Sequence, residues 1–468
     1  MRKFLLLAVS ILFLQIIHAQ HSILLKNVNI VDVEKGKLIK NANVLIRDSV
    51  IAAISTKPSN LKADTVIEGK NRYLIPGLWD MHVHIWTDAF FPLLLANGVT
   101  GVRDMLNYIQ LIQSWRKKIA SNEIAGPQII ASGPILDGPK PMWPGSVAVK
   151  DAADGKRAVD SLKNSLHTDF IKVYSLLPRD AYFAIAEEAK TQHIPFAGHV
   201  PAQITVVEAA RAGQKSQEHL YGFLEAASDS ADYYMQVVQD KIPDTNLKNQ
   251  VNAKQFLQRT FNAEKLKSVL QEIKKFDTYV CPTLVVLHSM AHVHDTTRWR
   301  DPRIQFLPKG VSNYWDPAKD PRSKTRTRES APVYEREFVM NLQIVKSIFD
   351  AGIPILAGTD FPNPYCFPGF GLHDELKWLV KAGLTPAQAL QTATINPARY
   401  LDLQNQYGTV SAGKIADLIL LDENPLSDIS NTQKIQSVFV HGKILNRSVL
   451  NNMLETAKKK AGHEVHRH

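Results

Sequence analysis

The chain is poor in cysteine, with only Cys281 and Cys366 in 468 residues. Two cysteines cannot form a disulfide framework in a chain this long, so its stability must come from a hydrophobic core. A single bridge between them is one alternative, but two buried, unpaired thiols are the preferred interpretation. Hydrophobic content of 45% and charged content of 21% are ordinary for a folded protein long enough for a barrel-sized domain and a smaller one.

Nucleic-acid-binding motifs are also missing, although the formal net charge is +10. Part of the excess comes from Lys458, Lys459, Lys460 and Arg467 near the C-terminus. No helix-turn-helix, zinc finger or basic stripe with interleaved aromatic residues accompanies these charges. A solvated basic surface is therefore favoured over nucleic-acid binding. We expect a small-molecule substrate as the partner, and self-association into a homo-oligomer stays open.

A long apolar run occurs only at the N-terminus, over residues 4–17. Arg2 and Lys3 precede it and Ala19 follows it, the arrangement of a secretory signal peptide cleaved near Ala19–Gln20. The run is short for a bilayer span, so no stable membrane anchor is expected after cleavage. Residues 1–19 are set aside as the signal peptide, and the mature chain is expected to be periplasmic or secreted.

The two ends of the mature chain are both rich in short apolar segments. These segments lie at residues 23–31, 42–46 and 50–54, and again at 415–421 and 437–440. Their length and the turn residues between them indicate strands. We predict one small β-sandwich domain made from residues 20–73 plus 405–450, followed by a basic tail at 451–468.

The middle of the chain, residues 74–404, alternates short apolar segments with helical periods such as residues 180–191. Eight strand candidates lie at 78–84, 99–104, 128–132, 170–174, 194–199, 216–219, 279–287 and 353–357. This alternation predicts an α/β fold, specifically a (β/α)8 TIM barrel. The alternative is an open doubly wound sheet, but the glycine-rich phosphate turn expected after its first strand is missing. Helical insertions at about 226–276 and 289–336 are candidate lids or binding loops.

Metal-ligand side chains occur at the ends of five of the eight predicted strands. His82 and His84 are two residues apart and so share one face of a strand. Each candidate alone is a weak signal, but catalytic groups of a barrel gather at the C-terminal ends of its strands. The full set of candidate ligands is His82, His84, Lys172, His199, His219 and Asp360.

Lys172 has two interpretations. Lysine is seldom buried without a partner, so it could form an ion pair with Asp80 or Asp360. Alternatively, its neutral amine could react with CO2 to give a carbamate, an anionic ligand that can bridge two cations. The other five donors, imidazole and carboxylate, suit Zn²⁺ and related divalent ions.

The sequence resembles the amidohydrolase superfamily over nearly all of the mature chain. Residues 76–84, PGLWDMHVH, resemble its first metal motif, and residues 408–418 resemble its C-terminal strand motif. A strand lysine followed by Gly-His-Val and Glu-His is similar to the binuclear branch with prolidase-like and imidazolonepropionase-like members. The loop at residues 175–178 departs from the glycine-rich version common in prolidase-like members, which leaves the substrate open.

The resemblance implies two divalent ions, best matched by Zn²⁺. His82, His84 and Asp360 would hold one ion, and His199 and His219 the other. A CO2-derived carbamate on Lys172 and a hydroxide would bridge them.

The expected activity is hydrolysis of carbon–nitrogen bonds of the amide or peptide type by the metal-bridging hydroxide, with Asp360 transferring the proton. Dipeptides and N-acyl amino acids are the expected substrates. Tyr174, Tyr221, Arg103 and His373 are candidate substrate contacts. The alternatives are a mononuclear-metal deaminase of a heterocycle and, ranked lower, a catalytically inactive binding protein of the same fold.

Overall fold

The computed structural model describes residues 22–57, 60–316 and 325–463. The predicted signal peptide therefore lies outside the described residues. Within those residues, no helix is both long and apolar enough to cross a membrane. Cys281 and Cys366 are buried, and they form no disulfide, as expected.

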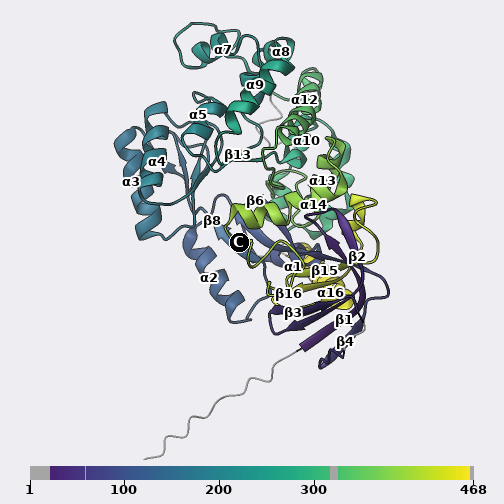
Figure 1. Cartoon of the computed structure of the whole chain (residues 1–468). Helices are drawn as coiled ribbons and strands as arrows, with labels where there is room; N and C mark the ends of the chain where they lie inside the picture. The colour runs from purple at the N-terminus through teal and green to yellow at the C-terminus, as the bar shows by residue number, and fades with distance from the viewer. Residues whose placement is uncertain (1–21, 58–59, 317–324, 464–468) are drawn as a thin grey trace, which may run out of the picture.

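Strands from both ends of the chain form one eight-stranded sheet, in the order β17-β16-β15-β5-β1-β2-β3 with β4 beside β1. Figure 1 shows the N-terminal strands beside those of the C-terminal segment. The strands are β1 (Ser22–Asp32), β2 (Lys37–Arg47), β3 (Val50–Ser55), β4 (Thr65–Glu68), β5 (Tyr73–Pro76), β15 (Leu418–Leu421), β16 (Ile435–Val440) and β17 (Lys443–Asn446). The two ends join where β5 pairs antiparallel with β15, with Ile75 opposite Ile419. The predicted union of the two ends is confirmed.

The strands of the middle region pair in parallel, as a (β/α)8 barrel requires. One sheet has the order β6-β7-β8, and a second has the order β10-β9-β11-β12-β13-β14. The strands are β6 (Leu78–Val83), β7 (Val99–Asp104), β8 (Gln128–Ala131), β9 (Ile135–Asp137), β10 (Val147–Ala148), β11 (Ile171–Val173), β12 (Phe196–Gly198), β13 (Ser216–Glu218) and β14 (Tyr279–Cys281).

Main-chain hydrogen bonds join these two sheets on both sides. The amide of Leu356 donates to Val280 in β14 at 2.9 Å, and Ala357 accepts from Met81 in β6 at 2.9 Å. The predicted eighth strand, residues 353–357, thus lies between β14 and β6, although it forms only an isolated bridge to β14. On the other side, the amide of Asp169, just before β11, donates to Ala131 of β8 at 3.0 Å.

The prediction of a strand over residues 279–287 was too long. Strand β14 ends at Cys281, and helix α10 (Leu284–Ala291) begins three residues later. Thr283 adopts the left-handed conformation with φ of 49°, which an extended strand cannot contain. The chain therefore turns there, at the rim of the barrel.

Helices follow most barrel strands and cover the sheets (Figure 1). The predicted helix at residues 180–191 is α4. The helices up to the second half of the barrel are η1 (Asp88–Phe90), α1 (Phe91–Ala96), α2 (Ile109–Ala120), α3 (Ala152–Asp160), η2 (Ser161–Ser165), α4 (Arg179–Thr191) and α5 (Val206–Arg211). The later ones are α12 (Ala331–Asp350), α13 (Phe370–Lys381), α14 (Pro386–Thr392), α15 (Ile395–Tyr400) and η6 (Ile429–Gln433).

Both predicted insertions contain short helices. The first holds α6 (Phe223–Ala226), α7 (Ala231–Val238), α8 (Gln250–Arg259) and α9 (Ala263–Ile273), and α7 to α9 lie at one end of the molecule in Figure 1. The second holds η3 (Thr296–Arg300), η4 (Pro302–Phe306) and α11 (Lys309–Tyr314) after α10.

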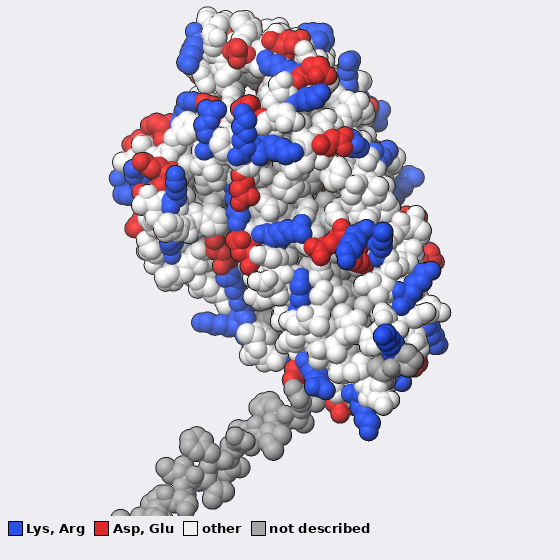
Figure 2. Space-filling model, viewed as in Figure 1, with Lys and Arg blue, Asp and Glu red and all other residues white. Residues whose placement is uncertain are grey.

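The segment treated above as a basic tail starts as a helix, α16 (Arg447–His463). Leu450 and Ala457 of this helix are buried, so it packs against the body of the protein. Figure 2 shows acidic and basic side chains interspersed over the face that it displays, without a field of one sign.

Candidate metal centre

The six predicted ligands line one cavity of about 300 Å³. They come from separate elements, since His82 lies in β6, Lys172 in β11, and the others just after β6, β12, β13 and the 353–357 segment. Parallel strands of a barrel end at the same face, which explains how residues far apart in sequence meet there. The predicted substrate contacts Tyr174 and Tyr221 line the same cavity.

His82 lies at the centre of the cluster. Its Nε2 is 3.5 Å from Lys172 Nζ and 3.5 Å from Asp360 Oδ1. The neighbouring His84 places its Nε2 3.0 Å from the same Asp360 oxygen. These contacts bring imidazole nitrogens and a carboxylate oxygen to one point. His82, His219 and Asp360 each offer one ligand atom, and these three atoms lie within 4.8 Å of one another, so they could hold one metal ion.

His199 and His219 complete the cluster. Their ring centroids are 4.7 Å apart, and that of His219 is 4.5 Å from His82. The Nδ1 atom of each is 2.7 Å from a hydroxyl, of Ser175 for His199 and of Thr283 for His219. Such partners fix the orientation of an imidazole and are typical of metal-ligating histidines.

Lys172 is buried at the base of the cavity, with 1% of its surface exposed. Among the residues that the structure describes, no carboxylate forms an ion pair with it. Asp80, one of the two proposed partners, instead accepts hydrogen bonds from the Thr359 amide and hydroxyl at 3.0 and 2.7 Å. Burial lowers the pKa of Lys172 from its usual 10.5 to about 8, although Glu218 and Asp360 favour its charged form.

Asp360 is held as an anion by its surroundings. Burial opposes ionisation of its carboxyl, but the hydrogen bond from His84 and the positive fields of His219 and Lys172 outweigh it and hold the pKa below the usual value. Asp360 and His219 also have positive φ angles, 58° and 63°. Strained backbone of this kind clusters at functional sites.

Two glycines allow the strands to approach one another closely here. A Cβ on Gly358 would lie 2.5 Å from Cys281 Sγ and 2.8 Å from His82 Cβ. A Cβ on Gly198 would lie 2.1 Å from the carbonyl oxygen of Val173, and the φ of Gly198 is 137°. Only glycine therefore fits immediately before Thr359–Asp360 and before His199.

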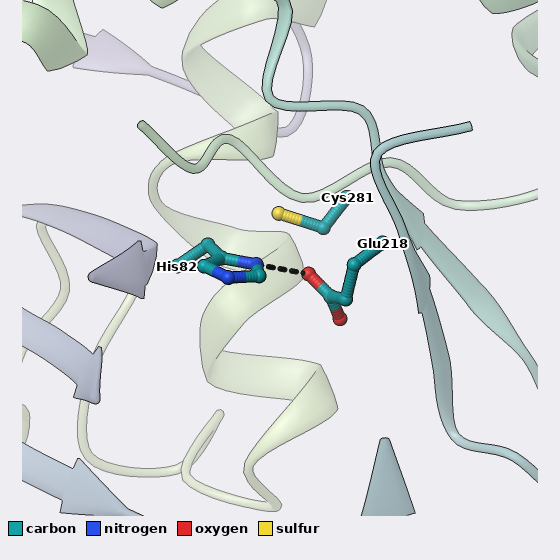
Figure 3. A group of neighbouring side chains, drawn as sticks. All are labelled: His82, Glu218 and Cys281. Atoms are coloured by element: carbon teal, nitrogen blue, oxygen red, sulfur yellow. Dashed lines mark hydrogen bonds and ion pairs between the residues drawn. The ribbon is translucent and has the colours of Figure 1, made fainter. Parts of the chain in front are cut away.

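On the side of His82 away from the cavity, Glu218 accepts a hydrogen bond from Nδ1 at 2.7 Å. Figure 3 shows Glu218 and Cys281 beside this ring. These three residues could also gather round an ion. However, Glu218 is already bound by Arg103 Nη2 at 2.8 Å, and burial raises the pKa of the Cys281 thiol well above its usual value. The group instead orients His82 so that Nε2 points into the cavity.

The structure brings neither Arg103 nor His373 to the cavity. Arg103 is buried below it and donates to Met81 O, Ser216 Oγ, Tyr400 OH and Glu218. His373 is buried in α13, where Nδ1 is 2.9 Å from Thr432 Oγ1 and Nε2 is 3.0 Å from Asn97 O. The prediction that Arg103 and His373 contact the substrate is corrected, because the nitrogen atoms of both side chains bind protein groups away from the cavity.

Most residues of the cavity wall were not singled out from the sequence, although Gln250, Met290, Tyr314 and Arg326 lie in the two insertions predicted as lids or binding loops. The Tyr174 ring stacks on His199 at 3.9 Å, and its hydroxyl accepts from Trp143 Nε1 at 2.7 Å. Trp143 belongs to the loop at residues 137–146, whose proline, glycine and aromatic residues suit a pocket wall, and the structure places it in the wall. Further wall residues are Trp86, Leu106, Met142, Gln250, Met290, Tyr314, Arg326 and Asn363.

Known proteins match this chain along most of its length. It is 24% identical over 462 residues to a 5-methylthioadenosine/S-adenosylhomocysteine deaminase of Caldanaerobacter subterraneus, covering 91% of this chain and 93% of that protein. The solved structure of bottromycin amidohydrolase superposes with a TM-score of 0.72 at 23% identity, covering 95% of this chain and 91% of that one. A prolidase solved with N-methylphosphonate-L-proline gives a TM-score of 0.65 at 19% identity, covering 91% and 100%.

These structures confirm the predicted barrel fold, since they share it over nine-tenths of the chain. The resemblance noted from the motifs is tested by the family model itself. The amidohydrolase family model matches residues 73–445, which contain every strand of the barrel and all six candidate ligands. The chain belongs to the amidohydrolase family and is a metal-binding hydrolase of that type.

Proposed function

We propose that this protein is a binuclear metal-dependent hydrolase of carbon–nitrogen bonds in small amides such as dipeptides and N-acyl amino acids. The observation that carries this proposal is Lys172, a buried amine without a carboxylate partner among the described residues, 3.5 Å from His82 Nε2. An unpaired buried ammonium is costly. Conversion to a carbamate removes that cost and supplies an anionic ligand between two groups of imidazoles.

The donor set fits two divalent ions. His82, His84 and Asp360 would hold one of them, His199 and His219 the other, with carboxylated Lys172 between them. Nitrogen and oxygen donors of this kind favour Zn²⁺. When bound, the ions supply a water of lowered pKa and polarise the carbonyl of the substrate.

Asp360 is the proton carrier in this proposal. Its carboxylate is ionised and opens onto the cavity, so it is available to take a proton from the attacking water and pass it to the leaving amine. Tyr174 and Tyr221 line the same cavity, with ring centroids 3.9 and 5.1 Å from that of His199. A phenol there can donate to the oxygen on which negative charge develops.

A mononuclear-metal deaminase is the second candidate, favoured by the full-length similarity to a deaminase. Lys172 distinguishes the binuclear hydrolase from the mononuclear deaminase, because a site with one metal ion does not require a bridging carbamate. Metal analysis of protein purified without chelator is therefore the first test. We expect about two zinc equivalents per chain and loss of one or both in Lys172→Ala, with Lys156→Ala at an exposed position as the control. One tight metal in both the wild type and Lys172→Ala would favour the deaminase.

Activity is tested with a library of dipeptides, N-acyl amino acids and heterocyclic amines, each assayed with and without chelator. We expect amide cleavage that chelator abolishes and zinc restores. Asp360→Asn should lose at least about a hundredfold in kcat, the usual contribution of a general base. Wild-type turnover in that variant, or cleavage that survives complete metal removal, would contradict the proposal.

A further inference from the structure

The charged groups of the cavity wall are few. Besides the histidines, they are Lys172, Asp360 and Arg326. Asp360 already contacts His84 at 3.0 Å, and Lys172 lies among the predicted ligands. Arg326 is different, because it belongs to the second insertion and to none of the strand ends.

Arg326 is held on a short turn that leads into α12. The Ser330 hydroxyl donates to Thr325 O at 2.8 Å, and the Ala331 amide donates to Thr327 O at 2.9 Å. The guanidinium carbon of Arg326 lies 4.7 Å from the centre of the Tyr334 ring, one helical turn into α12. Stacking on an aromatic ring fixes the plane of an arginine while leaving its N–H groups free to donate.

No described carboxylate forms an ion pair with Arg326. Arg326 also lines an adjoining cavity that holds Glu225 and Glu337. There, Glu337 is paired with Lys254, and the charged neighbours of Glu225 are Lys254 and Glu337. Within the described part of the chain, the wall therefore presents Arg326, a cation without an ion-paired carboxylate, to the same space as the predicted metal ligands. An ammonium group in this cavity would meet only Asp360 among the described acidic residues of the wall.

We infer that Arg326 binds a carboxylate of the substrate, so that the enzyme selects amides carrying a free carboxylate. This inference rests on the proposed amide hydrolysis and narrows its substrate class. The planar guanidinium can donate two parallel hydrogen bonds to a carboxylate, a geometry that lysine cannot reproduce. Trp86, Trp143 and Met142 line the same cavity and provide apolar surface for the uncharged part of such a substrate.

The test compares matched substrates that differ only in charge. Each cleaved substrate that carries a free carboxylate is compared with the same molecule in which that carboxylate is a neutral carboxamide. N-benzoylglycine and N-benzoylglycinamide are the corresponding pair of binding probes for calorimetry. Arg326→Gln should lower kcat/KM for the acid by roughly 10- to 100-fold, as expected for hydrogen bonds between charged groups, and leave the carboxamide nearly unchanged. Arg326→Lys should fall between them. Arg328→Gln, at an exposed position on the same turn, is the control and should match the wild type.

Binding separates this inference from the proposed function. If the wild type binds N-benzoylglycine more tightly than its amide, and Arg326→Gln loses that preference, the carboxylate site stands even if no amide is cleaved. Equal affinity of the wild type for both probes, or no binding of the acid, would overturn the inference. So would equal losses of kcat/KM for acid and carboxamide in Arg326→Gln.

Discussion

Replacing Glu218 by Gln tests how the centre is supported. The Glu218 carboxylate accepts from His82 Nδ1 at 2.7 Å and from Arg103 Nη2 at 2.8 Å, and all three side chains are at most 1% exposed. Glutamine has the same shape and can still accept from one of them. The substitution therefore removes charge with little change in packing.

Its expected cost follows from the charge left on Arg103. Although burial opposes charge on this guanidinium, Glu218 keeps its pKa above the usual value. Arg103 thus stays charged and buried without its counter-ion, which costs about 3–5 kcal/mol in buried pairs. The weaker support of His82 should also reduce metal affinity by roughly 10- to 100-fold, the usual effect of losing a group that orients a ligand.

Urea unfolding of the zinc-loaded and zinc-free proteins measures the first effect, and competition with a fluorescent chelator measures the second. Glu34→Gln is the matched control, because Glu34 pairs with Arg399 at 3.0 Å while both side chains are about half exposed. That pair should contribute less than about 1 kcal/mol. If Glu218→Gln unfolds as the control does and keeps wild-type zinc affinity, the assigned roles of Glu218 and Arg103 are wrong.

Two further predictions concern the fold. Burial raises the pKa of Glu375 from its usual 4.5 to about 8, so the folded state holds a proton that the unfolded state releases, and wild-type stability should fall as pH rises from about 4.5 to 8. Unfolding at pH 5, 6.5 and 8 should show this loss in the wild type and a flatter profile in Glu375→Gln; equal profiles would contradict the assignment. Gly101→Ala should destabilise by about 1–3 kcal/mol, because its Cβ would lie 2.3 Å from the buried Trp79 ring. Thermal melts measure this loss, and Gly310→Ala, whose added Cβ would have no atom within 4 Å, is the control that should show none.

The meeting of the six candidate ligands in one cavity could be predicted from the sequence because the signal is local. Each candidate stands at the end of an apolar segment, and a barrel gathers such ends at one face. Lys172 and His82, for example, lie 90 residues apart in sequence and 3.5 Å apart in space.

The hydrogen bonds that link His82, Glu218 and Arg103 could not be predicted from the sequence in the same way. His82 and Glu218 are 136 residues apart, and nothing local in either segment selects Arg103 as the third member. Arg103 ends a strand as the ligands do, so strand position alone suggested a substrate contact. Its side chain instead turns below the cavity, because Glu218 and Ser216 offer it buried acceptors.

Helix α16 was not predicted, although the sequence contains the apolar spacing of a helix. Leu450, Met453, Leu454 and Ala457 have the spacing of one helical face, and the structure buries Leu450 and Ala457 against the core. The segment was predicted to be a basic tail because of the lysines at 458–460, which follow this apolar face. Long basic side chains at the ends of such a face stay in solvent while the apolar face packs.

The arrangement of charge distinguishes the groups that support the candidate ligands from the groups that face the cavity. Below the cavity, Arg103 and Glu218 neutralise one another inside the protein, where an unpaired charge would be costly. Facing the cavity, Lys172 and Arg326 form no ion pair with a carboxylate among the described residues, which supports the proposals of a carbamate at Lys172 and of a substrate carboxylate at Arg326. Lys172 stands on a strand, and its partners follow from the fold. Arg326 stands on an insertion, where the barrel pattern places no constraint, and it is there that a shared metal centre can acquire its own substrate.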